Sequence, residues 1–150
     1  MTSSGGSRRP IRLALPAIGR DEPVRALGLA EGGDISPPSG VVQWYTGSVP
    51  PGATGIAVIA GHVSSPEPDV FHGLSGLSVG DRVRVTDTTG VHHGFVVERT
   101  ARVGKQELTR DPSVWGRSER PVLVLITCDD DSAVERGHYS GNFVVWCRAS

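Results

Sequence analysis

Two reactive side chains directly follow two continuous apolar runs of the sequence. His62 comes after the run 56–61, and Cys128 comes after the run 122–127. A thiol becomes a nucleophile when it loses its proton, and an imidazole exchanges protons near neutral pH. A cysteine and a histidine brought together would therefore suit nucleophilic catalysis, with the histidine handling the protons.

Both apolar runs have the length and composition of strands that are buried on both faces. If the two strands belong to one sheet, His62 and Cys128 can emerge at the same end of it. The alternative for each residue is structural. Free cysteine is among the most buried residue types, and a single histidine at a strand end often has no chemical role.

A third group is needed to stabilise the oxyanion that forms when a thiolate attacks a carbonyl. Arg136, in the segment before the last strand, has a permanent charge and several hydrogen-bond donors. Its charge would also offset the acidic run 129–131, which follows Cys128. Arg148 is a second candidate for the same role. Either arginine could instead be a solvated surface residue.

The other candidates have weaker functional interpretations. Cys147 falls within the last apolar segment and is expected to fill the core, although a bridge to Cys128 is conceivable. His72 and the pair at 92–93 are expected on the surface. The acidic run 129–131 could bind a hard cation such as calcium, but a solvated loop is the simpler interpretation. We predict neither a metal nor a cofactor.

The elements that position these residues are predicted to be short strands. The chain has 150 residues, 20 of them glycine and 11 proline, and its 15 basic side chains balance 16 acidic ones. This composition favours strands joined by turns, and scattered basic residues exclude a nucleic-acid-binding surface. We expect strands within 11–19, 56–63, 122–127 and 142–149, and a hairpin over 81–103. Short helices are expected near 71–77 and within 104–121.

About eight strands are predicted in all, which makes the protein all-β. A closed barrel would leave none of them with an unpaired edge, and a sandwich is the alternative. Residues 1–9 are predicted to form a disordered tail, and residues 10–150 a single domain. No apolar run approaches the roughly 20 residues that a membrane helix needs.

The sequence resembles the sortases, which are cysteine transpeptidases on the outer face of Gram-positive bacteria. Three segments carry the resemblance in order and spacing: IAVIAGHVSS with the histidine, VLVLITCDD with the cysteine, and GHYSGNFVVW at the closing strand. The second departs from the family's Thr-any-Thr-Cys signature, because Leu125 and Ile126 precede Thr127. The match extends over nearly the whole chain after residue 9. Its details are most similar to the actinobacterial class F sortases, with class E as neighbour.

The resemblance implies an eight-stranded β-barrel with a catalytic site of His62, Cys128 and Arg136, and with Thr127 near the oxyanion. It implies cleavage of a sorting motif such as Leu-Pro-any-Thr-Gly through a thioacyl enzyme. The acyl group would pass to an amine of a pilin or of a cell-wall peptide. A monomer is expected, on the extracellular face of the membrane and anchored by an N-terminal segment that this chain lacks.

Three other functions remain open from the sequence. A plain cysteine peptidase would let water resolve the acyl enzyme. A non-catalytic β-barrel binding module would keep its cysteine and histidine as core residues. A metal site could use His62, Cys128 and an aspartate.

Overall fold

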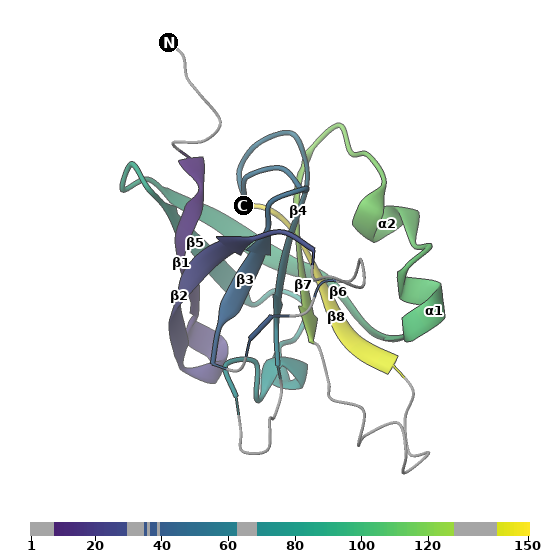
Figure 1. The fold of residues 1–150 in the computed structure, drawn as a ribbon. Helices are drawn as coiled ribbons and strands as arrows, with labels where there is room; N and C mark the ends of the chain where they lie inside the picture. Colours follow the sequence, from purple (N-terminus) through teal and green to yellow (C-terminus); the bar gives the residue numbers. More distant parts are fainter. Residues whose placement is uncertain (1–7, 30–34, 36, 39, 63–68, 128–140) are drawn as a thin grey trace.

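The structure is a computed structural model that describes residues 8–29, 35, 37–38, 40–62, 69–127 and 141–150. Within these residues, eight strands close into one barrel (Figure 1). In chain order they are β1 (Pro10–Leu15), β2 (Arg20–Leu27), β3 (Val42–Tyr45), β4 (Gly55–Gly61), β5 (Arg82–Asp87), β6 (His92–Gly104), β7 (Pro121–Thr127) and β8 (Gly141–Ala149). The prediction of an all-β protein with a closed eight-stranded barrel is confirmed, and the sandwich alternative is not.

Neighbours around the barrel follow the order β1, β2, β3, β4, β7, β8, β6, β5. Most pairs are antiparallel, including the predicted hairpin of β5 and β6. Two pairs are parallel, β2 with β3 and β4 with β7. The strands β4 and β7 are far apart in the sequence, yet they lie side by side in the barrel wall (Figure 1).

The helices of the described residues are short and lie in connections. Helices were predicted where η3 (Leu74–Gly76), α1 (Lys105–Leu108) and α2 (Pro112–Trp115) lie. The segment 11–19 was predicted as a strand, but β1 ends at Leu15 and η2 (Pro16–Ile18) follows, because Pro16 has no amide hydrogen to continue the strand ladder. The start of α2 is favoured by Pro112 in its first turn and by Asp111, whose Oδ1 accepts the Ser113 amide at 2.9 Å. None of the helices in this part of the chain has the length and apolar character needed to cross a bilayer.

The core has two layers because β4, β7 and β8 are covered on both faces. Along β4, Ala57 and Ile59 point into the barrel, whereas Ile56, Val58 and Ala60 belong to a second cluster outside it. Side chains alternate along β7 and β8 in the same way. The connection that contains α1 and α2 covers the outer cluster with Leu108 and Val114. This two-sided burial explains why the two segments read as continuous apolar runs.

Candidate active site

The strands β4 and β7 run parallel and end together. Their register runs residue by residue and finishes with Gly61 opposite Thr127. His62 is the next residue after Gly61, and Cys128 is the next residue after Thr127. The two buried strands therefore share a sheet and end at the same edge, which is the condition under which the sequence would bring His62 and Cys128 together. Cys128 and Arg136 lie outside the described residues, so their catalytic roles stay predictions.

Gly61 lets the chain fold back tightly beside His62. A Cβ atom at Gly61 would lie 2.9 Å from Cγ2 of Val70 and 3.1 Å from Cγ of Phe71, which is closer than the packing allows. Phe71 is fully buried, and its amide donates a hydrogen bond to the carbonyl oxygen of His62 at 2.9 Å. The residue before the histidine therefore has to be small, and the backbone of His62 is held from the segment that follows.

The ring of His62 is half-buried, and its Nε2 lies 2.7 Å from the carbonyl oxygen of Pro37. A carbonyl oxygen can only accept a hydrogen bond, so Nε2 must carry the proton. In a neutral ring the proton-accepting nitrogen is then Nδ1. The contact thus selects one tautomer and gives His62 a defined atom with which to take a proton from a thiol or an amine.

Thr127 holds the end of β7 against β8. Its side chain is buried, and its Oγ1 accepts the amide of Phe143 at 2.7 Å. The backbone pairing of the two strands extends to Ile126 opposite Val144, so this hydroxyl continues the connection by one residue. Thr127 therefore positions the strand end just before Cys128. Its predicted contact with the oxyanion stays a prediction.

Arg148 lies away from this edge. It lies within β8 and pairs with Val122 near the start of β7. At about 3.3 Å per residue, Val122 is roughly 16 Å from Thr127 along the strand. The exposed side chain of Arg148 instead lies 3.9 Å from Glu98, measured from Nε to Oε1. The structure therefore does not bring Arg148 together with His62.

Cys147 fills the core, as predicted. It is 1% exposed, and burial raises the pKa of its thiol to about 12, with a further contribution from the charge of Glu98. It pairs with Leu123, which at about 3.3 Å per residue lies roughly 13 Å along β7 from Thr127. A disulfide needs Cα atoms within about 7 Å of each other. The strand register therefore opposes a bridge between Cys147 and the residue after Thr127.

Iodoacetamide at pH 8 is expected to leave Cys147 unmodified in the native protein, because only the thiolate reacts and this thiol stays protonated and enclosed. Unfolding in guanidinium chloride should make it react like an ordinary cysteine. Peptide mapping by mass spectrometry gives the result. Native labelling of Cys147 at the rate seen in guanidinium would contradict this.

Of the other histidines, His93 does not fit its predicted surface position. Its side chain is 19% exposed, and Nε2 lies 2.8 Å from Oδ2 of the buried Asp87. Burial alone would raise the pKa of Asp87, but hydrogen bonds from Thr89 and His93 outweigh it and lower the pKa to about 2. This pair closes the turn between β5 and β6. His72 and His92 are exposed, as predicted.

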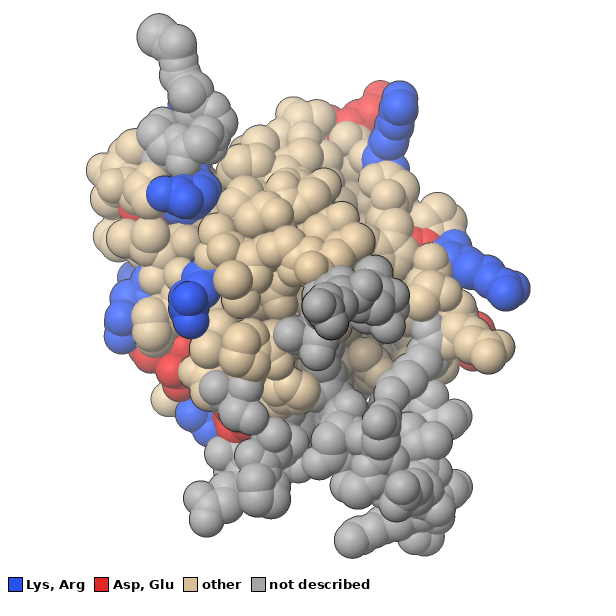
Figure 2. Space-filling model, in the orientation of Figure 1, with Lys and Arg blue, Asp and Glu red and all other residues tan. Residues whose placement is uncertain are grey.

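An open pocket of about 480 Å³ lies between α2 and the turn that joins β3 to β4. Ile56 and Val58, from the outer face of β4, form its floor, and Tyr45 and Trp115 meet edge to face with ring centroids 6.0 Å apart. Figure 2 shows that the described surface over β3 and β4 is largely uncharged, with charged side chains at its margins. If the alternation of β4 continues, His62 faces the same side as Val58, about 13 Å further along.

Neither this pocket nor the carbonyl of Pro37 could be recognised from the sequence. A backbone carbonyl has no residue-type signature, because every residue has one. The proximity of Pro37 to His62 depends on how the loop before β3 crosses the end of β4, which no local pattern specifies.

Fold and site together define a closed β-barrel protein with a histidine and a cysteine following the ends of two parallel, neighbouring strands. Residues 13–150 match the sortase domain family. The chain therefore belongs to the sortase family, whose members are cysteine transpeptidases. No curated protein matches the chain.

Solved sortases have the same fold. Sortase A from Corynebacterium diphtheriae has a TM-score of 0.72 and 21% identity over 95% of this chain and 61% of that chain. Sortase C-3 from Streptococcus pneumoniae has a TM-score of 0.69 and 22% identity over 98% of this chain and 65% of that chain. The sortase D5 transpeptidase of Clostridium perfringens has a TM-score of 0.69 and 16% identity over 99% of this chain and 82% of that chain. This chain thus spans less than two thirds of the first two.

Proposed function

We propose that this chain is the catalytic domain of a sortase that cleaves a motif similar to Leu-Pro-any-Thr-Gly and transfers the acyl group to an amine. The observation that carries the proposal is the register of β4 and β7, which end with Gly61 opposite Thr127. In the sequence, His62 and Cys128 are the residues that directly follow these paired positions. A cysteine nucleophile needs a proton-transfer partner within reach, and this edge supplies one.

The reaction has two halves. In the first, His62 takes the proton of the Cys128 thiol, the Sγ atom attacks the scissile carbonyl carbon, the C–N bond breaks, and His62 passes the proton to the departing amine. In the second, the incoming amine attacks the thioacyl carbon, His62 takes its proton, and the C–S bond breaks to restore the cysteine. Arg136 and backbone N–H groups near Thr127 stabilise the oxyanion in both halves. The departing and incoming amines thus use the same histidine.

The pocket beside α2 suits the acyl part of the substrate. This part precedes the scissile bond and must stay bound while the departing amine leaves and the new one enters. About four extended residues span the distance of roughly 13 Å between Val58 and His62. The apolar floor and the aromatic pair of Tyr45 and Trp115 fit an apolar peptide better than a charged one.

Replacing Trp115 with alanine is expected to raise KM for a sorting peptide about tenfold and to leave kcat within about twofold, because an aromatic contact made equally in ground and transition states is lost. Steady-state kinetics measures both. Trp115→Phe is the control, because it keeps a ring in the wall but removes the Nε1 hydrogen bond to the carbonyl oxygen of Leu108 at 2.6 Å. A fall in kcat with unchanged KM would place the peptide elsewhere.

The proposal is tested by incubating the chain with a fluorogenic sorting peptide, with and without triglycine, and identifying the products by mass spectrometry. A triglycine adduct supports the transpeptidase. The carboxylic acid alone, even at high triglycine concentration, favours the cysteine peptidase, and no cleavage of any sorting peptide favours the binding module.

The described residues contain no group of three His, Cys, Asp or Glu side chains that could hold a metal ion. The run 129–131 lies outside them.

The finer assignment is supported by the sequence motifs. They favour class F of the actinobacterial sortases, with class E next. We further propose that the domain acts as a monomer on the extracellular face of the cell membrane. Its substrates would be proteins with a C-terminal sorting signal, and its second substrate an amine of a pilin or of a peptidoglycan precursor.

A further inference from the structure

Two separate backbone segments hold His62. The loop before β3 contributes the carbonyl oxygen of Pro37, which accepts from Nε2 at 2.7 Å. The segment before η3 contributes the amide of Phe71, which donates to the carbonyl oxygen of His62 at 2.9 Å. The first contact fixes the ring and the second fixes the backbone. The orientation of the ring therefore depends on how these two segments sit relative to each other.

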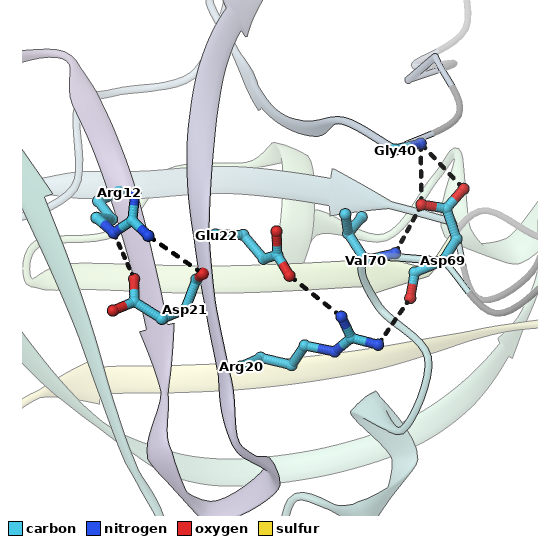
Figure 3. A network of polar contacts seen from close by, with 7 residues as sticks. All are labelled: Arg12, Arg20, Asp21, Glu22, Gly40, Asp69 and Val70. Carbon is cyan, nitrogen blue, oxygen red and sulfur yellow. Dashed lines mark hydrogen bonds and ion pairs between the residues drawn. The ribbon is translucent and has the colours of Figure 1, made fainter.

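A single carboxylate ties the two segments together. Oδ1 of Asp69 accepts the amide of Val70 at 2.6 Å and the amide of Gly40 at 2.9 Å, and Oδ2 lies 3.1 Å from the same Gly40 amide (Figure 3). Asp69 is 9% exposed. Val70 directly precedes Phe71, and Gly40 belongs to the loop that carries Pro37. The Asp69 side chain thus bridges the two contacts of the histidine.

Gly40 is coupled to the proline segment by a tight turn. The amide of Val41 donates to the carbonyl oxygen of Pro38 at 3.2 Å, and Gly40 between them has φ of 76°, a conformation that favours glycine. A shift of the Gly40 amide therefore moves Pro38 and its neighbour Pro37. Because Pro37 presents its carbonyl to Nε2, the displacement reaches the imidazole.

The main chain of Asp69 is in turn anchored to the barrel. Nη2 of Arg20, in β2, donates to the carbonyl oxygen of Asp69 at 3.3 Å, while Nη1 donates to Oε2 of Glu22 at 3.1 Å. Figure 3 shows Arg20 reaching between Glu22 and Asp69, with Arg12 and Asp21 forming a separate pair nearby. Asp69 is therefore linked to the barrel wall through its main chain and to the amides of Gly40 and Val70 through its carboxylate.

We propose that Asp69 is a positioning residue for His62, setting the orientation and the tautomer of the imidazole through Gly40 and the carbonyl of Pro37. Its effect on turnover rests on the proposed function, because only then does the ring transfer protons. Its effect on the tautomer does not depend on the proposed function. With Nε2–H held by Pro37, a neutral ring has its proton-accepting nitrogen at Nδ1, and loss of the link would let the ring sample both tautomers.

Asp69→Ala removes all three acceptor contacts, whereas Asp69→Asn keeps an amide oxygen that can occupy the Oδ1 position. For Asp69→Ala, kcat on a sorting peptide should fall roughly 10–100-fold with KM within about threefold, because the reacting ring is misplaced while the peptide still binds. Asp69→Asn should recover most of this loss.

Asp87→Ala is the matched control. Asp87 is also a buried carboxylate that accepts several hydrogen bonds around a turn, but its partner His93 packs against Gly52, before the start of β4, at the other end of that strand from His62. Thermal unfolding of both variants shows the stability that each loses. Asp87→Ala should unfold at a lower temperature but should not show the fall in kcat that is expected for Asp69→Ala.

The ring nitrogens of His62 provide a readout that does not need activity. In two-dimensional ¹⁵N–¹H spectra of the imidazoles, the signals missing in His62→Gln identify His62. Wild type and Asp87→Ala should show the Nε2–H tautomer, and Asp69→Ala a mixture. If Asp69→Ala keeps the wild-type tautomer and kcat, or loses kcat only in proportion to stability as Asp87→Ala does, the positioning role is wrong. If wild type does not turn over a sorting peptide, but Asp69→Ala still shows the expected mixture of tautomers, the proposed function is refuted and the positioning role is supported.

Discussion

Cys128→Ala is expected to abolish the thioacyl enzyme and to lower turnover of sorting peptides by at least about 10⁴-fold. Alanine cannot attack a carbonyl, and the remaining groups of the site only bind and polarise the substrate. Intact-mass spectrometry of the enzyme mixed with a sorting peptide, without an amine, should show the acyl adduct in wild type. The variant should show none.

Cys147→Ala is the matched control for this substitution. It removes the other thiol of the chain, which is enclosed by the barrel core. It should therefore still form the acyl adduct, although it should unfold at a lower temperature because a buried side chain becomes smaller. An acyl adduct on Cys128→Ala, or cleavage at the wild-type rate, would show that another residue is the nucleophile.

His62→Ala is expected to lower kcat/KM for a sorting peptide by about 10²–10⁴-fold, the usual contribution of a positioned acid–base group. An amide substrate needs a proton on its leaving nitrogen before the C–N bond can break. An ester of the same acyl sequence with a good leaving group needs none. The variant should therefore acylate with the ester at a rate much closer to wild type than with the peptide.

His92→Ala serves as the control, because His92 is exposed and lies at the start of β6. It should leave both substrates unaffected. Burst kinetics with each substrate separates acylation from the later amine step. An equal loss on ester and peptide would mean that His62 acts before the leaving group departs, by activating the Cys128 thiol or by holding the site together, and that it is not the acid for the leaving amine. No loss on either would remove it from the mechanism.

The sequence predicts most of what brings His62 and Cys128 together. Strands buried on both faces give long apolar runs, so β4 and β7 stand out, and each ends directly before a reactive residue. The glycine before His62 signals close packing, which the structure shows to be against Val70 and Phe71. These features depend on residues that are neighbours in the sequence, so they can be recognised from a single sequence.

What the sequence could not predict depends on contacts between distant segments. The hydrogen bond from His62 to Pro37 spans 25 residues, and that from Gly40 to Asp69 spans 29. Neither involves a motif, because backbone amides and carbonyls occur at every position. His93 was assigned to the surface for the same reason, since its burial comes from Asp87 and the nearby turn. The arginine of the site stays a prediction from the resemblance, with Arg136 favoured once Arg148 is placed elsewhere.

The most direct test of the central claim, that His62 and Cys128 form a coupled pair, is the rate of Cys128 alkylation as a function of pH. A small thiol reagent is applied to native wild type and His62→Ala, and the labelled peptides are mapped by mass spectrometry. The account predicts that Cys128 reacts in the native protein, that Cys147 does not, and that loss of His62 changes the pH profile of Cys128. Identical profiles in the two proteins, or a Cys128 that reacts only after unfolding, would contradict it.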